Sequence, residues 1–494
     1  MTDVSQPITT STPIGTLHER WTARVVAYVA ILILVNVMVD SVLAAPTYVL
    51  PHLARAFDTN QFAWVGASAM LAGAMWSPLL GKSADIYGKR RVLVITLLVA
   101  AIGSVVCLSA PVLWVFVVGR LLQGAAVASL FLTVAIIRDI CAPKFALGVT
   151  GIVTTGSALF GIATPFILEP VIEIFGWQAV FVISGSFAIV AALLVRLVVP
   201  ESRNRTPGRV DVLGAIVLGI GLAGVLGYIS LGQVIGWAGV GSLLVLALGA
   251  AALLFWFFAL SRRPEPIIDI RGISLALGLG LLVVVMGTGA YQSKLQLISM
   301  LVDVSPDEGL GYGLASPLAL GLLFGVPSIG IALGGIGAGY IAKRVGPAWC
   351  LGVAILTGTL ATALMLFGDG PNNLAVAVPA SFLLSLTAGN LVTSGFNLAS
   401  ILAPKERQAT VSSMIMVMIA VGSVTMNFVG SAILGGTAIV VDGESVNSVV
   451  GIFSYIATIG GVFVVAAIPA VFLIRRMRGR VAVMGTETTS MSHL

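Results

Sequence analysis

Charge and cysteine are both scarce in this 494-residue chain. Only 9% of the residues are charged, whereas 58% are hydrophobic, and the mean hydropathy is +1.08. Soluble globular domains carry charge on about a quarter of their residues. The composition therefore excludes an ordinary soluble protein and indicates a polytopic helical membrane protein.

The low number of cysteines and histidines excludes several kinds of site. Cys107, Cys141 and Cys350 are odd in number and lack metal-type spacing, so we expect small packing residues and no disulfide. The 3 histidines lie in the tails and one loop and form no metal or catalytic cluster. No Gly-x-x-x-x-Gly-Lys-Ser/Thr segment occurs, which argues against direct ATP coupling. No cofactor and no metal are therefore predicted.

Long apolar segments recur along the chain. Segments of about 20 residues or more, enough to cross a bilayer as a helix, occur fourteen times between positions 25 and 474. The first follows Arg20 and Arg24 and is too long for the h-region of a cleaved signal peptide, so we expect it to remain as a membrane helix. The sequence thus predicts an all-α membrane protein with fourteen transmembrane helices.

Lysine and arginine mark one side of the predicted membrane protein. With both termini in the cytoplasm, 22 of the 26 lysines and arginines fall in inside segments, and outer loops keep only Arg55. The net charge of +6 is scattered over short loops and forms no single patch, so nucleic acid is not an expected partner. We predict a multi-pass protein of the cytoplasmic membrane of a bacterium, with both termini inside.

A short charged loop, residues 81–91, separates the second and third apolar segments. Glycines at its turns allow close helix approach, and its basic residues hold it at the cytoplasmic face. Its pattern, Gly-x-x-x-Asp-x-x-Gly-Lys/Arg-Arg, resembles the loop signature of the major facilitator superfamily; a basic loop of an unrelated membrane protein is the alternative. The resemblance implies a conformational latch, in which the carboxylate approaches the N-terminus of helix 13. The predicted latch consists of Gly81, Asp85, Gly88, Lys89 and Arg90.

The loop between predicted helices 10 and 11 repeats this spacing. Gly339, Lys343 and Gly346 follow the first three latch positions at an offset of 258 residues, which indicates two related six-helix bundles. Two more helices lie between charged linkers, a layout that resembles the fourteen-helix drug:proton antiporter branch. That fold implies a substrate site near the midplane between halves that open alternately. The predicted parts are an N-terminal tail (1–24), an N-terminal bundle (25–200), a linker with two extra helices (201–271), a C-terminal bundle (272–475) and a C-terminal tail (476–494).

Charges within the apolar spans cost about 2.5 to 3.5 kcal/mol at a helix centre and therefore indicate function. Asp40 and Asn36 lie one turn apart on helix 1, so we expect both to face the cavity, although an Asp near the outer surface would also be hydrated. Arg120 opens an Arg-x-x-Gln-Gly segment that resembles the family's helix 4 motif. The resemblance implies a role in proton coupling; an arginine bonded to backbone carbonyls is the alternative. Gln123 shares its face and is assigned to the cavity.

Helix 5 departs from the family pattern of Gly-Pro-x-x-Gly-Gly followed by a Trp. Pro165 precedes Trp177 by the family's spacing of twelve residues, but Leu168 and Glu169 replace the paired glycines. Glu169, which precedes Pro170, is expected near the outer mouth, either as an interfacial carboxylate or as a gate. It is the third candidate for proton coupling.

Polar side chains in predicted helices 9 and 12 complete the expected cavity. A lysine in helix 9 would attract an anionic or zwitterionic substrate, or would snorkel to the outer surface. Hydrogen bonds between helices explain the asparagines of helix 12 equally well. These candidates are Tyr291, Gln292, Lys294, Gln296, Asn390 and Asn397.

Together these features predict a secondary active transporter that exports drug-like or secondary-metabolite molecules in exchange for protons. Its partners would be a small-molecule substrate, protons and membrane lipids, and a monomer would suffice. A transporter of lipids or siderophore-like compounds without strict proton antiport is the alternative. A lipid-linked transferase would need a catalytic cluster in a large loop, and no such loop occurs in the sequence. A channel would not require two alternating halves.

Overall fold

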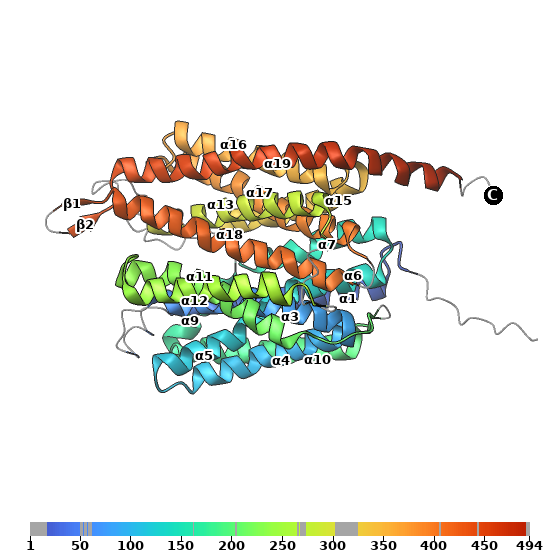
Figure 1. Cartoon of the computed structure of the whole chain (residues 1–494), viewed down its shortest axis with the longest axis horizontal. Coiled ribbons are helices and arrows are strands. Elements are labelled where there is room, and N and C mark those ends of the chain that lie inside the picture. The colour runs from blue at the N-terminus through green and yellow to red at the C-terminus, as the bar shows by residue number, and fades with distance from the viewer. Residues whose placement is uncertain are drawn as a thin grey trace, which may run out of the picture.

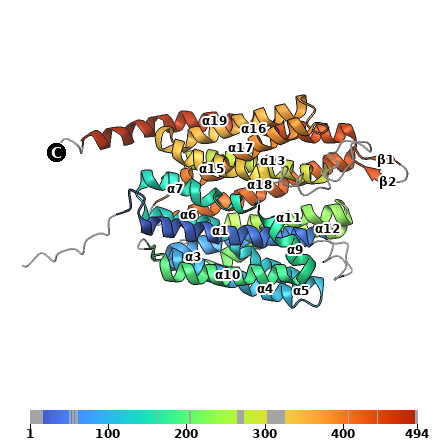
Figure 2. The ribbon, with the colours of Figure 1, turned by 180° about the vertical axis from the view of Figure 1, so that it is seen from behind.

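The computed structural model describes most of the chain as a bundle of long helices (Figure 1). The described residues are 17–49, 53, 57, 62–161, 163–202, 205–263, 266, 273–301, 325–404, 407–441 and 444–490. Within this part, eleven helical segments are long and apolar enough to cross a membrane. One segment, α1, begins at the same end of the bundle at which α19 ends (Figures 1 and 2).

The N-terminal half contains a bundle of helices packed around small and aliphatic side chains. Its core includes Leu32, Leu93 and Phe131, which are fully buried. The helices are α1 (Ala23–Tyr48), α3 (Phe62–Tyr87), α4 (Lys89–Leu108), α5 (Leu113–Gln123), the 3-10 helix η1 (Gly124–Ala128), α6 (Ser129–Ile140), α7 (Pro143–Thr155), α8 (Ala158–Gly161), α9 (Thr164–Phe175) and α10 (Gln178–Val198).

Two further helices, α11 (Val212–Ile235) and α12 (Val240–Phe255, continued by the π-helix η2, Trp256–Leu260), lie between the two halves in Figure 1. They pack closely through glycine, because a Cβ atom on Gly224 would lie 2.5 Å from the Cα atom of Gly249. Asp211 caps the start of α11 through the Gly214 N–H (2.9 Å) and pairs with Arg263 after η2 (3.6 Å). The linkers on either side of the pair thus meet.

The C-terminal half packs in the same way around Leu351, Phe396 and Phe463. One small feature departs from the predicted all-α fold, namely an antiparallel β-hairpin between the last two helices. The elements are α13 (Leu275–Leu301), α15 (Val326–Val345), α16 (Pro347–Phe367), α17 (Leu374–Leu402), α18 (Gln408–Gly436), β1 (Ile439–Val441), β2 (Glu444–Val446) and α19 (Val449–Ser490).

The predicted helix 5 is interrupted, in contrast to the single span expected from its sequence. It runs as α7, α8 and α9, with breaks after Thr155 and after Gly161. Pro165 lies in the first turn of α9, where a missing N–H is tolerated. Pro170 lies inside α9, which continues to Phe175, although a proline disfavours helical backbone at the residue before it. Gly156 lies at the first break and Pro165 follows the second, so these two residues are the local signals of the interruption.

Candidate functional site

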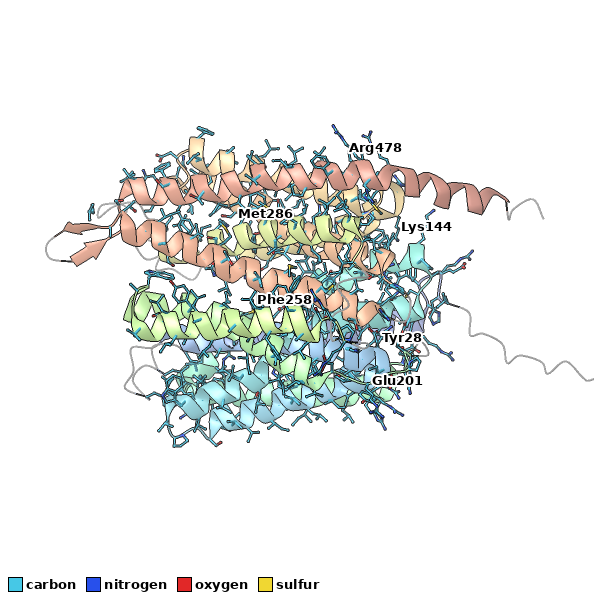
Figure 3. All side chains as sticks on the ribbon, in the orientation of Figure 1. Tyr28, Lys144, Glu201, Phe258, Met286 and Arg478 are labelled. Carbon is cyan, nitrogen blue, oxygen red and sulfur yellow. The ribbon has the colours of Figure 1, made fainter. Side chains whose placement is uncertain are left out.

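The two halves meet at the end of the bundle that carries Lys89, Lys144, Arg344 and Arg478, here called the basic end. Figure 3 shows Lys144 and Arg478 toward this end. One contact joins α3 to α18 and another joins α7 to α15, which lie side by side in Figure 2. Asp85 and Lys343, the equivalent positions of the repeated loop, each lie in one of these contacts.

Asp85 of the N-terminal half caps α18 of the C-terminal half. Its Oδ1 accepts a hydrogen bond from the Ala409 N–H (3.1 Å), and its Oδ2 accepts from the Thr410 N–H (2.8 Å) and hydroxyl (2.7 Å). The first N–H groups of a helix have no partner within it, and the N-cap residue Arg407 makes no side-chain cap hydrogen bond. The carboxylate therefore satisfies donors that the C-terminal half leaves open.

The electrostatics of Asp85 reflect two opposing effects. This residue is buried beyond the apolar part of α3, at the basic end. Burial raises the pKa of Asp85 to about 6, while the hydrogen bonds from Thr410 and Ala409 and the charge of Lys89 oppose that rise. The carboxylate is thus mainly ionised at pH 7 but titrates within reach of physiological pH.

Two positions of the latch require glycine, one because no space is left for a Cβ atom and one because of its backbone conformation. A Cβ atom on Gly81 would lie 2.8 Å from Oγ of Ser413 and 3.0 Å from the carbonyl oxygen of Ala409, so only glycine lets α3 approach α18 this closely. Gly88 has φ of +108°, which other residues rarely adopt, and it joins α3 to α4.

The basic residues of the latch are held within the N-terminal half. Lys89 is fully buried and its Nζ lies 2.7 Å from Oδ1 of Asp139 at the end of α6. Arg90 and Arg91 each approach Oε2 of Glu201 at 3.6 Å, and Oε1 of Glu201 accepts from the Arg90 N–H at the start of α4 (3.1 Å). These contacts fix the turn beside Asp85. The segment predicted as a loop, 81–91, is helical except for Gly88, because α3 continues to Tyr87 and α4 begins at Lys89.

The repeated loop makes the second contact with a cation in place of a carboxylate. The Nζ atom of Lys343 lies 4.2 Å from the ring centroid of Tyr340 and 5.7 Å from that of Phe145, which belongs to α7. A Cβ atom on Gly339 would lie 2.7 Å from the carbonyl oxygen of Leu147, so this glycine has the same packing role as its counterpart in α3. The sequence repeat therefore corresponds to two equivalent helix contacts between the halves.

Further hydrogen bonds join the halves between the basic end and mid-depth. Nη2 of Arg138 donates to Oδ1 of Asn397 (2.8 Å), whose Nδ2 donates to the carbonyl oxygen of Leu147 (3.3 Å). The hydroxyls of Thr154 and Thr393 are 2.8 Å apart. Thr154 lies eleven residues into α7, about 17 Å from its start at 1.5 Å per residue.

The Asp40 carboxylate faces helix 5. Asp40 is exposed although it lies within the apolar span of α1, and the Ser157 side chain is hydrogen bonded to it. Asn36, one turn earlier, is buried and its Nδ2 donates to the carbonyl oxygen of Val153 in α7 (2.7 Å). Both side chains therefore lie on the side of α1 that faces the interrupted helix.

Arg120 is the centre of a buried polar network in the N-terminal half. Its Nη1 donates to the carbonyl oxygen of Val42 (2.7 Å) and to Oε1 of Gln123 (2.8 Å). Nε2 of Gln123 donates to Oγ of Ser104 (2.8 Å), which lies 3.3 Å from Oγ of Ser184. The role of Arg120 in proton coupling, which the family resemblance implies, stays a prediction.

The candidates of predicted helices 9 and 12 lie in α13 and α17, and most of their contacts are within the C-terminal half. Lys294 is 5% exposed, and its Nζ has no hydrogen-bond partner among the described residues. It borders a small cavity with Thr362 and Leu384, and Tyr291 is buried nearby in the core. Asn390 donates to the carbonyl oxygen of Cys350 (3.0 Å).

Three other candidates carry less structural information. Gln292 is half-buried on α13. The side chains of Glu169 and Gln296 lie outside the described residues.

Several residues of the contact between the halves were not singled out from the sequence. Arg138 and Asp139 end α6 as a charged pair beside an apolar run, a signal that resembles the one used for the latch loop. Thr410 and Ser413 carry no such signal, because hydroxyl residues are common throughout the apolar helices. Their role depends on the approach of α3.

A family model described as Major Facilitator Superfamily matches residues 29–318 and 205–427. The chain belongs to this superfamily. The family and the eleven long apolar helices of the described part together indicate a multi-pass membrane protein. The arrangement of two halves agrees with this assignment, as does the position of the signature residues in the contacts between them at the basic end.

Individual relatives are transporters of different substrates. A triacylglyceride transporter of Mycolicibacterium hassiacum is 30% identical over 342 residues, 66% of this chain and 61% of that protein. A multidrug resistance protein B homolog of Mycobacterium tuberculosis is 28% identical over 315 residues, 62% of this chain and 56% of that protein. The multidrug resistance protein Stp of the same species is 25% identical over 397 residues, 78% and 71% of the two chains. The match thus spans less than two thirds of the first two relatives.

Solved structures of the superfamily share the fold. A human organic anion transporter aligns with a TM-score of 0.62 at 18% identity, covering 90% of this chain and 99% of that chain. A proton:xylose symporter aligns with a TM-score of 0.57 at 14% identity, covering 90% and 95%. At these identities the likeness concerns the fold alone.

Proposed function

We propose that the protein is a proton-coupled exporter of drug-like or secondary-metabolite molecules that works by alternating access. It would lie in the cytoplasmic membrane of a bacterium as a monomer, with fourteen transmembrane helices and both termini in the cytoplasm. The observation that carries the proposal is the contact between the halves at the basic end. A carboxylate cap, a few side-chain hydrogen bonds and glycine contacts hold it closed, and all of these can separate as the halves rock.

Asp40 is the proposed proton carrier. It is an exposed carboxylate within an apolar span, next to Ser157 at the first break of helix 5. Placing a carboxylate within an apolar span costs free energy, so its presence there indicates a function. Because its neighbour belongs to an interrupted helix, a shift of α8 and α9 changes the surroundings of the carboxylate, and this change would couple protonation to the state of the halves.

The roles of the other candidates follow from their contacts. Arg120 holds the backbone of α1 two residues beyond Asp40, through the carbonyl of Val42, and would thereby position the carboxylate. Asn397 bridges the halves in the closed form and would face the substrate once the bridge opens. Glu169 remains the alternative proton carrier.

Transport of a lipid is the second candidate function. The 30% identity with a triacylglyceride transporter favours it, as does the loss of the paired glycines at Leu168 and Glu169, since the antiporter motif of helix 5 is then incomplete. Such a transporter would not need strict proton exchange.

Purified protein in proteoliposomes with an imposed pH gradient tests the proposal. We expect wild type to accumulate a cationic dye or drug against its gradient only when the pH difference is present. Asp40→Asn should abolish this accumulation but keep downhill movement, because the proton site is lost and the pathway is not. Asp369→Asn, which removes an exposed carboxylate outside the spans, serves as the matched control.

Two outcomes would contradict the proposal. Accumulation by Asp40→Asn under a pH gradient alone would exclude Asp40 as the carrier and direct attention to Glu169. Transfer of a fluorescent triacylglycerol between leaflets at equal rates with and without the gradient, together with no dye transport, would favour the lipid transporter.

A further inference from the structure

A cavity of about 460 Å³ lies at the basic end and is lined by residues of the C-terminal half. It lies between the loop that joins α15 to α16 and the segment of α19 around residue 475. Figure 3 shows Arg478 at this end of α19. The lining includes Arg344, Pro347, Trp349, Ile474, Met477 and Arg478.

Two guanidinium groups give the cavity a positive charge. The guanidinium of Arg478 lies 5.3 Å from the ring centroid of Trp349, so the aromatic face holds it beside the cavity. Arg344 lies on the opposite element and is exposed. No acidic side chain among the described residues lies within 4.0 Å of either group. Two positive charges thus line one cavity without an ion pair.

The backbone adds donors on the same side. The α16 helix begins at Pro347, and its N-cap residue Gly346 has no side chain to accept from the first N–H groups. The N–H groups of Ala348 and Trp349 therefore have no partner within the helix, and both residues line the cavity. The positive end of the helix dipole favours an anion at this place.

The helices that leave the cavity present apolar side chains outward. Gly352 allows α16 to approach α19, since a Cβ atom there would lie 2.6 Å from Cδ1 of Ile474. Val353 and Leu356 of α16 and Phe472 of α19 are exposed, and both helices are long and apolar enough to cross a membrane. A soluble anion would use only the charged part of this surface, whereas a phospholipid would use both parts.

We propose that this cavity, called the headgroup site, binds the phosphate of an anionic phospholipid whose acyl chains run along α16 and α19. Arg344 and Arg478 contact the phosphate from two sides, because guanidinium groups match phosphate oxygens in pairs. The N–H groups at the start of α16 complete the site. The lipid anchors the C-terminal half at the membrane surface.

Native mass spectrometry of the delipidated full-length protein, titrated with phosphatidylglycerol, tests the headgroup site. A guanidinium that contacts the phosphate directly contributes at least about 1 kcal/mol, which is about a fivefold change in affinity. We therefore expect Arg344→Gln with Arg478→Gln to weaken the tightest phosphatidylglycerol about 25-fold. Arg475→Gln with Arg476→Gln removes the same charge from exposed residues that do not line the cavity, and should change affinity less than fivefold.

The remaining arms separate a specific lipid site from other sources of binding. Equal losses in the two double variants would overturn the proposal, since attraction would then follow net charge. Displacement of the lipid by an equal concentration of inorganic phosphate would also overturn it in favour of a soluble anion. Phosphatidylcholine should bind all variants alike. Unchanged melting temperatures verify that the exposed substitutions leave the fold intact.

Discussion

Asp85 is a helix cap that one half of the molecule supplies to the other. Replacing Asp85→Ala leaves two backbone N–H groups and one hydroxyl of α18 without their acceptor, and a lost hydrogen bond to a charged group costs about 1.5 to 3 kcal/mol. We expect the population open at the basic end to rise about tenfold or more. Electron paramagnetic resonance distances between labels at Arg196→Cys and Arg475→Cys, both exposed, measure this population.

The smaller substitution Thr410→Val serves as a graded control. It removes only the hydroxyl donor, while both N–H groups remain, so the shift should be smaller than for Asp85→Ala. Identical distance distributions in Asp85→Ala and wild type would show that the cap does not hold the closed form.

Asp85 also makes closure depend on pH. Its pKa is about 6 in the closed form, whereas an exposed aspartate titrates near 3.9. The closed form therefore binds the proton more tightly than the open form. The extra stability that protonation gives the closed form is fully present below about pH 3.9 and is lost as the pH rises through about 6. Between pH 7.5 and pH 5 the ratio of closed to open protein should increase about tenfold.

The same pair of labels measures this pH dependence in detergent, where both ends experience one pH. The increase should vanish in Asp85→Ala. If it persists there, another titrating group controls closure.

Lys294 places a positive charge in the apolar interior of the C-terminal half. No described residue accepts a hydrogen bond from its Nζ, and burial of an unpaired charge opposes folding. Lys294→Met keeps the approximate volume, so we expect a higher melting temperature, by analogy with buried charges whose apolar replacement stabilises by about 1 to 4 kcal/mol. Lys144→Met, at an exposed lysine, should leave the melting temperature unchanged.

A lower melting temperature for Lys294→Met, with slower transport of anionic substrates, would instead place the ammonium in the substrate path. That outcome would agree with the sequence-based hypothesis that Lys294 attracts an anionic substrate. The burial of Lys294 favours a higher melting temperature.

At the residue scale, the sequence predicts which side chains matter better than it predicts their partners. Asp85 stands out because a carboxylate between glycines in a basic loop has no packing role. The partners Ala409 and Thr410 lie more than 300 residues away and contribute backbone groups that no side-chain pattern reveals. Gln123 was assigned to the cavity, yet its amide completes the Arg120 network, since two polar groups one turn apart satisfy each other.

The helix pair α7 and α15 depends on glycine for its separation at mid-depth as well. A Cβ atom on Gly335 of α15 would overlap the Thr155 side chain of α7, whereas one on Gly337 would meet nothing within 4 Å. Gly335→Val should therefore force α7 and α15 apart and populate the open form, while Gly337→Val on the same helix should not. Both variants carry the same change in helix propensity, so a difference between them in the spin-label distances reports the contact of Gly335 with Thr155 alone.

A Gly335→Val protein with unchanged distances would mean that the helices rotate to accept the side chain. Closure would then not depend on this glycine.

At the element scale, the length of the apolar segments predicts where helices lie but does not predict breaks within them. The apolar stretches of the sequence at 92–110 and 179–199, two of the fourteen predicted spans, agree closely with α4 and α10. The division of helix 5 into α7, α8 and α9 was not expected from its apolar length, although Gly156 lies at the first break and Pro165 follows the second. Such breaks depend on packing against α1 and α15, which the local sequence does not contain.

At the scale of the whole molecule, the charge asymmetry gives a direct test of orientation. The basic end carries the start of α1 and the end of α19, so the distribution of lysine and arginine should place both termini in the cytoplasm. A fluorescent protein fused after residue 494 should fluoresce in a bacterial host, and alkaline phosphatase fused there should be inactive. Active phosphatase would reverse the orientation.

The two equivalent contacts between the halves carry opposite charges, Asp85 in one and Lys343 in the other. Both occupy the same position of the repeated loop, so rocking of the halves moves a negative and a positive charge through similar depths of the membrane field. These two positions therefore contribute displaced charge of opposite sign. A change at either position alone should make closure at this end more sensitive to voltage, since one charge crossing the whole field contributes about 2.3 kcal/mol per 100 mV.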